Sequence, residues 1–240
     1  RFYPSGTAPR EVYDASYFTG YQGGDYFESV PQRRHEARVR LSLLPEPREG
    51  ADRLLEVGSA AGFFLDEARK AGWKVTGVEP SAETAAFAEE SFGVEVRTGF
   101  VEDLDLSDVK PSAICAWHTL EHIPDPLETV VSLGDDLPQG GEMVVEVPNG
   151  ASLRAGVMGE KWAPLEPNVH VAQWTPQALE ALFLRAGFSE VKVNTVPFIT
   201  YIENPLTRFS RQFLLVARQR RWLREPHPTG HELLRAFAVK

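Results

Sequence analysis

Residues 54–64, LLEVGSAAGFF, are the stretch of the chain that decides the fold. The apolar run 53–57 is typical of a buried strand, and the apolar spacing that follows is typical of a helix beginning at Phe63. A turn of glycine, serine and alanine, residues 58–62, joins the two. Small residues there allow a ligand to lie against the backbone, and the helix start offers free N–H groups. The stretch therefore predicts a strand, a ligand-binding turn and a helix.

Outward from this stretch, short apolar runs alternate with longer helix-patterned segments, which is the pattern of a parallel sheet with crossover helices. No strong helix separates the last two runs, so the last strand is expected to be antiparallel. The predicted fold class is α/β, with a Rossmann-like, seven-stranded, mostly parallel sheet and helices on both faces. We expect strands at residues 53–57, 74–78, 94–97, 113–117, 142–147, 190–196 and 213–217. Helices are expected at residues 63–71, 82–92, 126–133 and 176–186, the last three with Ser81, Asp125 and Thr175 as N-caps.

The length of 240 residues fits one large α/β domain with short additions. Residues 1–48 combine aromatic side chains with a basic, helix-like stretch at 32–44, and we expect an N-terminal lid segment there. The core is expected at residues 49–218, and residues 219–240 are expected to form a C-terminal tail. Within the core, residues 149–174 are too long for a routine connection and are a candidate substrate insertion.

The composition argues against several functions. A formal net charge of −9 disfavours binding to nucleic acid or to anionic membranes. The chain has no apolar run of the roughly 20 residues that a membrane span needs, and its first residues lack the apolar core of a signal peptide. We therefore expect a cytoplasmic protein. The single cysteine, Cys115, lies in an apolar run and is expected to be a buried hydrophobic residue.

Glu79 lies at the end of the second expected strand, 21 residues after Gly58. An acidic side chain in that place can accept hydrogen bonds from both ribose hydroxyls of a nucleoside cofactor. Two kinds of cofactor compete. A dinucleotide favours G-x-G-x-x-G, whereas the chain has G-x-x-x-G preceded by Glu56. Because the Glu56 carboxylate would repel a pyrophosphate, the pattern is better suited to a cofactor with an α-ammonium group.

Six segments follow one another in an order and at a spacing that together are far more specific than any one of the motifs alone. They are LLEVGSAAG at 54–62, GVEPS at 77–81, GFVEDLDL at 99–106, HTLEHIPDP at 118–126, GGEMVVEVPN at 140–149 and HVAQWTPQALEALFLRAGF at 170–188. Together they resemble the class I S-adenosylmethionine-dependent methyltransferases, in particular the small-molecule branch that includes the ubiquinone-pathway O-methyltransferases. The resemblance covers roughly residues 50–218. It implies S-adenosylmethionine as the cofactor and a small molecule as the methyl acceptor.

The resemblance also implies which residues bind the cofactor. By position, the turn at Gly58 lies at the methionine part, Glu79 at the ribose, and the Val101 backbone and Glu102 carboxylate at the adenine. Ala60 departs from the pattern, because many relatives have glycine there. Alanine restricts φ, so either the turn needs no positive φ at this position or cofactor binding is weakened. The expected cofactor-binding residues are Glu56, Gly58, Ser59, Ala60, Gly62, Phe63, Glu79, Pro80, Phe100, Val101, Glu102, Trp117, His118 and Leu120.

The segment 118–126 contains H-x-x-E-H, the spacing of an inverted zinc-protease signature. A zinc site of this kind needs a continuous helix that places both histidines on one face, and Pro124 and Pro126 prevent one. The remaining histidines lie far away in sequence without ligand spacing, so we expect no metal. The resemblance places His118 beside the cofactor and the acceptor, as a base or as a positional residue, and makes His122 an anchor of the turn.

Methyl transfer from a sulfonium is a direct displacement, and an acceptor hydroxyl must lose its proton as the new bond forms. We predict transfer to a hydroxyl of a small-molecule acceptor, with base assistance from His118 or His170. His170 lies in the expected insertion, where relatives place residues that face the acceptor; a role that only fixes the loop is the alternative. Two other functions stay open, a non-catalytic protein that binds S-adenosylmethionine and a nicotinamide-dependent oxidoreductase.

Overall fold

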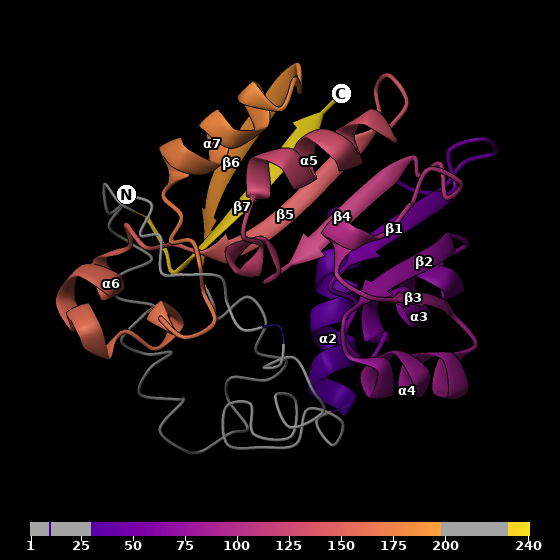
Figure 1. Cartoon of the computed structure of the whole chain (residues 1–240), viewed down its shortest axis with the longest axis horizontal. Helices are drawn as coiled ribbons and strands as arrows, with labels where there is room; N and C mark the ends of the chain where they lie inside the picture. Colours follow the sequence, from indigo (N-terminus) through magenta and orange to yellow (C-terminus); the bar gives the residue numbers. More distant parts are fainter. Residues whose placement is uncertain (1–9, 11–29, 198–229) are drawn as a thin grey trace.

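A computed structural model describes residue 10, residues 30–197 and residues 230–240 (Figure 1). A seven-stranded sheet in these residues has the strand order β3-β2-β1-β4-β5-β7-β6. Strands β1 to β5 pair in parallel, and β7 is antiparallel to both of its neighbours. The predicted α/β class, with a Rossmann-like and mostly parallel sheet, is confirmed. The strands are β1 (Arg53–Val57), β2 (Lys74–Glu79), β3 (Glu95–Thr98), β4 (Ala113–Trp117), β5 (Glu142–Pro148), β6 (Glu190–Val196) and β7 (Leu233–Val239).

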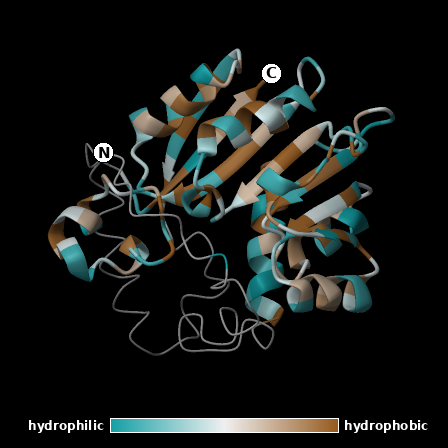
Figure 2. Ribbon diagram, viewed as in Figure 1, coloured by the Kyte–Doolittle hydropathy of each residue, from teal (hydrophilic) through white to brown (hydrophobic). Residues whose placement is uncertain are grey.

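Helices cover both faces of the sheet, as predicted, and the strands between them are largely hydrophobic (Figures 1 and 2). Because side chains alternate along a strand, the neighbours Leu54 and Leu55 point into different core clusters. The cluster around Leu54 includes side chains of α2 and α3, and the cluster around Leu55 includes side chains of α5 and α7. The helices are α2 (Val30–Leu41), α3 (Phe63–Lys70), α4 (Ala82–Phe92), α5 (Pro126–Asp135), α6 (Leu153–Met158) and α7 (Pro176–Arg185). None of the described helices is long and apolar enough to cross a membrane.

The predicted N-caps of three helices are confirmed. Ser81, Asp125 and Thr175 each accept a hydrogen bond from the backbone N–H three residues later, at 3.3, 3.0 and 3.2 Å. These bonds satisfy N–H groups that have no partner inside the helix. They set where α4, α5 and α7 begin, and for α4 this point follows directly after β2.

The seventh strand differs from the predicted one. Residues 213–217 lie outside the described residues, and the strand that completes the sheet is β7, which the sequence analysis assigns to a C-terminal tail. β7 lies between β5 and β6, and Leu234 has no exposed surface. The expected tail is therefore wrong for residues 233–239. Arg235 is the one charged residue in the apolar stretch LLRAFAV. Its charge is paired inside the fold, because Arg235 Nη2 lies 2.7 Å from Oε2 of buried Glu146.

The expected insertion, residues 149–174, contains α6 and two short 3-10 helices, η5 (Gly159–Lys161) and η6 (Ala163–Leu165). Its two ends lie together, because Gly150 N donates to Trp174 O at 2.8 Å. Trp174 itself is buried. The insertion thus leaves and rejoins the sheet at one place.

The expected aromatic part of the N-terminal segment lies outside the described residues. The basic helix predicted after it is α2, which packs on α3 through charged contacts. Arg34 Nη1 lies 2.7 Å from Asp66 Oδ2, and Arg34 also pairs with Glu67. The contact brings α2 to the edge of the sheet where β1 ends.

Replacing Leu234 by alanine should lower the free energy of unfolding by about 2–5 kcal/mol, because it opens a cavity at a fully buried position. Urea unfolding of Leu234→Ala beside the wild type measures this loss. Lys192→Ala, at an exposed position of the neighbouring β6, is the control and should change the free energy by less than about 0.5 kcal/mol. Equally small changes in both variants would contradict a core position for β7.

Candidate active site

The glycine turn after β1 has the backbone geometry that its composition suggests. The Gly58 and Ser59 N–H groups both donate to Val78 O on β2, at 2.8 and 3.0 Å. Gly58 has a φ of 74°, and a Cβ at this position would lie 2.3 Å from Thr119 Oγ1. Ala60 has a φ of 44°, so the turn does need a positive φ there. Alanine adopts this conformation at a cost of about 1–2 kcal/mol.

Glu79, the last residue of β2, is fixed against the turn. Its carboxylate accepts hydrogen bonds from Ala60 N at 2.9 Å and from Ser81 N at 3.0 Å. Burial raises the pKa of Glu79 to about 7, although the two backbone donors oppose the shift. The residue is buried and still borders a pocket. A ligand in the pocket can therefore reach a carboxylate that bulk water hardly reaches.

Glu56 and Ser59 present buried polar atoms to the same pocket. Among the described residues, neither Glu56 Oε2 nor Ser59 Oγ has a hydrogen-bond partner. Burial raises the pKa of Glu56 well above its ordinary value, and Arg40 opposes the shift. An unsatisfied buried polar atom costs free energy, so its presence in a pocket indicates a ligand that donates hydrogen bonds. An ammonium group fits such a set of acceptors.

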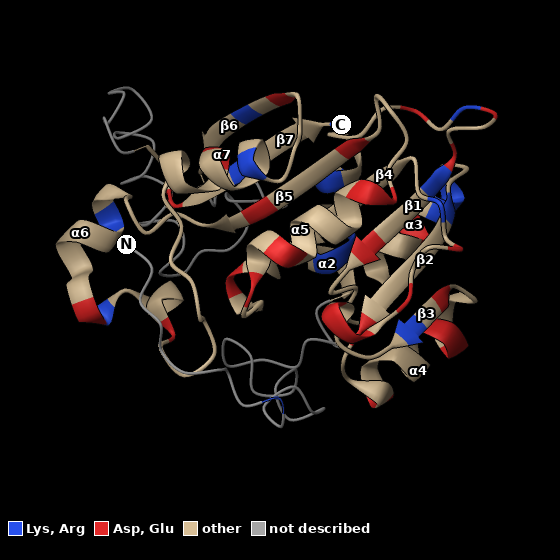
Figure 3. Cartoon of the chain, turned by 45° about the horizontal axis from the view of Figure 1, so that its top comes forward, with Lys and Arg blue, Asp and Glu red and all other residues tan. Residues whose placement is uncertain are grey.

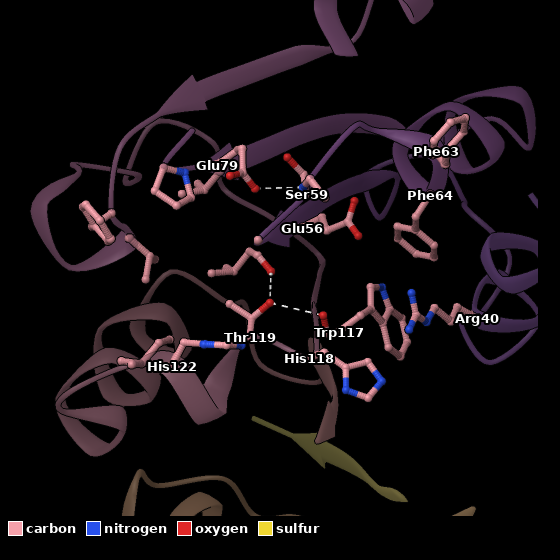
Figure 4. Close-up of a pocket in the computed structure, with 18 of the residues that line it drawn as sticks. Arg40, Glu56, Ser59, Phe63, Phe64, Glu79, Trp117, His118, Thr119 and His122 are labelled. Carbon is pink, nitrogen blue, oxygen red and sulfur yellow. Dashed lines mark hydrogen bonds between the residues drawn. The ribbon is translucent and has the colours of Figure 1, made fainter. Parts of the chain in front are cut away.

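One pocket brings most of the predicted cofactor-binding residues together (Figure 4). It lies at the carboxyl ends of β1, β2 and β4, the edge at which open α/β sheets bind ligands. Figure 3 shows acidic residues near the ends of β1 and β2. The predicted residues that line the pocket are Glu56, Gly58, Ser59, Ala60, Phe63, Glu79, Pro80, Phe100, Val101, Glu102, Trp117 and His118.

Three predicted site residues do not line this pocket. Leu120 is 1% exposed and belongs to the hydrophobic core, because the short helix η4 (Leu120–His122) turns it inward. Gly62 is the N-cap of α3, where an added Cβ would lie 2.7 Å from the Cβ of Ala88. His170 is separated from the pocket and contacts His122 instead. Leu120 and Gly62 therefore shape the site without bordering it.

The pocket also includes residues that the sequence analysis did not assign to cofactor binding. Four of them come from α2 at positions 33, 36, 37 and 40. This i, i+3, i+4, i+7 spacing marks one face of a helix and is the signal that could have found them. The full set is Arg33, Glu36, Ala37, Arg40, Val57, Phe64, Val78, Gly99, Thr119, His122 and Ile123.

His118 is held between two buried carboxylates. Its Nδ1 lies 3.5 Å from Glu121 Oε1, and its Nε2 lies 3.4 Å from Glu146 Oε1. Two acceptors, one facing each ring nitrogen, favour the imidazolium, in which both nitrogens carry protons. Burial lowers the pKa of His118, but Glu121 and Glu146 outweigh burial and raise it to about 9. At neutral pH the ring therefore has no lone pair with which to act as a base.

The environment of Glu146 also favours the charged form of His118. Burial opposes ionisation of Glu146, but His118, Arg40 and Arg235 outweigh it and lower the pKa to about 2. Arg235 Nε and Nη2 donate to Glu146 Oε2 at 3.1 and 2.7 Å. Glu146 is thus favoured as an anion beside His118 at neutral pH.

His122 and His170 form a second pair at the pocket wall. Their ring centroids lie 4.6 Å apart in an edge-to-face arrangement. The Nδ1 atoms face backbone carbonyls, that of His122 facing Val169 O at 3.3 Å and that of His170 facing Pro164 O at 2.7 Å. Burial lowers the pKa of His122 to about 4, so its ring is neutral at neutral pH. His122 therefore offers an uncharged imidazole to the pocket, which His118 does not.

Glu121, His122 and His170 could also hold a metal ion. One ligand atom from each lies within 4.8 Å of the other two. The expectation that no third ligand lies near is wrong, because folding brings His170 next to His122, which precedes it by 48 residues. The Glu121 carboxylate already faces the His118 imidazolium. The expectation of no metal stays a prediction.

The imidazole of His118 should titrate with a midpoint near pH 9, well above the ordinary value of about 6.5, because two carboxylates stabilise its charged form. Proton-detected NMR of the histidine ring signals measures this midpoint. In Glu146→Gln the midpoint should fall, since one of the two anions is removed. Since the pKa is raised by folding, this contribution to stability is complete below about pH 6.5 and is lost as the pH rises through 9. A midpoint near 6.5 in the wild type would refute the clamped imidazolium.

A family model described as a methyltransferase domain matches residues 30–193. The chain belongs to this family, the S-adenosylmethionine-dependent methyltransferases, and the predicted resemblance is confirmed. The ubiquinone biosynthesis O-methyltransferase of Xylella fastidiosa is 29% identical over 157 residues, which are 60% of this chain and 63% of that protein. The chain thus spans just under two thirds of that relative's length. The enzyme of the same description from Idiomarina loihiensis is 25% identical over 187 residues, 71% of this chain and 74% of that protein.

Solved structures share the fold. A Thermotoga maritima methyltransferase described as a possible histamine N-methyltransferase has a TM-score of 0.63 at 23% identity, covering 90% of this chain and 94% of its own. A plantazolicin methyltransferase, solved in complex with SAH, has a TM-score of 0.59 at 16% identity, covering 96% of this chain and 89% of its own. At these identities the similarity shows the fold alone.

Proposed function

We propose that the pocket binds S-adenosylmethionine and that the protein transfers its methyl group to a hydroxyl of a small-molecule acceptor. The observation that supports this most is the buried Glu56 carboxyl, whose Oε2 has no hydrogen-bond partner in the described part of the chain. Glu56 would accept from the α-ammonium group, and such a cation favours the ionised carboxylate. Glu79 would accept from the ribose hydroxyls, with its orientation already set by Ala60 and Ser81.

The adenine end of the cofactor would lie at Phe100, Val101 and Glu102, where η3 (Val101–Asp103) begins. The Val101 backbone and the Glu102 carboxylate would supply the polar contacts. Arg10 lies over this end, because its guanidinium is 4.5 Å from the Phe100 ring centroid and 3.7 Å from Glu102 Oε1.

S-adenosylmethionine would supply a methyl group on a sulfonium, from which the acceptor oxygen takes the methyl carbon as the carbon–sulfur bond breaks and S-adenosylhomocysteine leaves. The contribution of the chain is to hold the reacting atoms in line and to keep water away. Trp117 ends β4, His118 follows it, and the two would form the wall between cofactor and acceptor. His118, with its fixed positive charge, would act there as a positional residue.

We assign removal of the acceptor proton to His122, with His170 as the residue that positions its ring. His122 lines the pocket with a neutral ring, and His170 lies against it. A general base must have a free lone pair within reach of the acceptor, which favours His122 over His118. A non-catalytic protein that binds S-adenosylmethionine is the second candidate, because the pocket histidine nearest the turn, His118, is engaged by two carboxylates. A nicotinamide cofactor is disfavoured because the turn has G-x-x-x-G in place of the G-x-G-x-x-G that a dinucleotide favours.

Calorimetry should show that the protein binds S-adenosylhomocysteine and not NAD. Glu79→Gln should weaken S-adenosylhomocysteine binding about 10- to 100-fold, because it removes a charged acceptor for the ribose hydroxyls. Glu83→Gln, an exposed substitution in the first turn of α4, is the matched control and should bind like the wild type. Binding of NAD, or equal binding by both variants, would contradict the proposed cofactor site.

His170→Ala should reduce turnover at saturating cofactor by about 100-fold with a hydroxyl acceptor, because His122, the base at the pocket wall, loses the ring that positions it. Turnover of S-adenosylmethionine is followed against a panel of hydroxylated small molecules, with S-adenosylhomocysteine affinity as the control for an intact site. Unchanged turnover in His170→Ala would exclude the assigned role. Absence of turnover in the wild type with every acceptor class would favour the non-catalytic candidate.

A further inference from the structure

Glu121 is a buried carboxylate whose oxygens the fold leaves unsatisfied. The residue is 1% exposed, and neither Oε1 nor Oε2 has a hydrogen-bond partner in the part of the chain that the structure describes. Its contact with His118 is an ion pair of 3.5 Å through Oε1. A buried carboxylate normally accepts hydrogen bonds or binds a metal ion, because removing its charge from water is costly. Glu121 therefore has acceptor capacity that the proposed transfer does not use.

Two imidazole rings lie beside this carboxylate. One ligand atom from each of Glu121, His122 and His170 lies within 4.8 Å of the other two. The Nδ1 atom of His122 faces Val169 O at 3.3 Å, and that of His170 faces Pro164 O at 2.7 Å. A histidine that binds a metal through one nitrogen typically donates the N–H of the other to a backbone carbonyl or a carboxylate. Both rings thus have the surroundings of metal ligands.

Backbone hydrogen bonds hold the three residues together. The Val171 and Ala172 N–H groups both donate to Glu121 O, at 2.9 and 3.2 Å. His170 directly precedes this contact and His122 directly follows Glu121, so both histidines are fixed on either side of it. Bonds of about 2.0–2.2 Å to one zinc ion place ligand atoms about 3.5 Å apart, so the side chains need to move by only about 1 Å. Little reorganisation is needed when an ion binds.

We propose that Glu121, His122 and His170 form a Zn²⁺ site in the pocket wall, and that bound zinc blocks the methyl transfer. Two imidazole nitrogens and a carboxylate oxygen are a donor set that suits zinc, whereas Mg²⁺ and Ca²⁺ prefer oxygen ligands alone. The inhibition rests on the proposed function, in which His122 takes the acceptor proton. Zinc and the Val169 carbonyl would together engage both ring nitrogens, which leaves no lone pair for that proton.

This site differs from the zinc-protease spacing H-x-x-E-H. It uses Glu121 and His122 but not His118, and the third ligand comes from the end of the insertion, so no continuous helix is needed. The His118 imidazolium on the other side of Glu121 opposes a cation. A second carboxylate offsets this charge, because Glu166 Oε2 lies 3.8 Å from His170 Nε2. The proposed site replaces the expectation of no metal.

Calorimetry with Zn²⁺ tests the site on the whole 240-residue chain after treatment with a chelator. The wild type should bind one zinc ion per chain. Glu121→Gln and His170→Ala should each weaken zinc binding at least about 100-fold, because each removes one of three ligands. His35→Ala, at a partly buried histidine of α2 outside the cluster, is the matched control and should bind zinc like the wild type. Urea unfolding shows that each variant is folded.

Turnover measures the inhibition. One equivalent of bound zinc should reduce wild-type turnover with a hydroxyl acceptor by about 100-fold, the contribution of a general base, and a chelator should restore it. His35→Ala should be inhibited at the same zinc concentration as the wild type.

The results separate the zinc site from the proposed function. A wild type that binds no zinc, or binds it no better than Glu121→Gln and His170→Ala, would overturn the site and leave the transfer reaction intact. Turnover that zinc leaves unchanged or raises would overturn the inhibition and the role of His122 as the base. A wild type that transfers no methyl group in zinc-free buffer would refute the proposed function, and calorimetry would still decide the site.

Discussion

The buried carboxylate of Glu146 constrains much of the structure. It has no exposed surface, and removing its charge from water is costly unless cations surround it. Three cations from separate parts of the chain do so: Arg235 at 2.7 Å, His118 at 3.4 Å and Arg40 at 3.6 Å. The described N-terminal helix, the final strand and the end of β4 are therefore tied to one point in the sheet. That point lies directly beside the pocket.

This arrangement decides what the pocket histidines can do. An imidazole between two buried carboxylates is stabilised in its charged form, so His118 provides a fixed cation and not an exchangeable lone pair. His122 differs, because its Nδ1 faces the Val169 carbonyl and burial lowers its pKa, so its ring is neutral. The resemblance implied His118 as a possible base and His122 as an anchor of the turn, and their neighbours in the fold favour the opposite assignment.

Local sequence patterns were sufficient to predict most of the fold. Alternation of apolar runs predicted six strands of the sheet, and Ser81, Asp125 and Thr175 marked the starts of three helices. The turn at Gly58 and the acidic residue Glu79 were also predictable, because strands, turns and their spacing are local features. A strand such as β7 is harder, since the arginine within it resembles a surface residue until its partner is known.

The features that could not be predicted from the sequence depend on contacts between residues that are far apart along the chain. Arg235 and Glu146 are 89 residues apart, and nothing near either one predicts a buried ion pair. His170 meets His122 only after the insertion folds back on the turn, which is why a third ligand beside Glu121 was missed. The face of α2 that borders the pocket is visible in its spacing, but its direction is set by the contact of Arg34 with α3.

The position of β7 has a consequence for the order of events during synthesis. In the described sheet β6 pairs with β7 alone, and β7 is also the strand that covers the edge of β5. The ribosome completes residues 190–196 well before residues 233–239 emerge. Until then the nascent chain exposes the unpaired edge of β5, has no partner for β6, and leaves Glu146 without Arg235. Such open edges are sites of aggregation, so this side of the sheet is where a chaperone would be needed during translation.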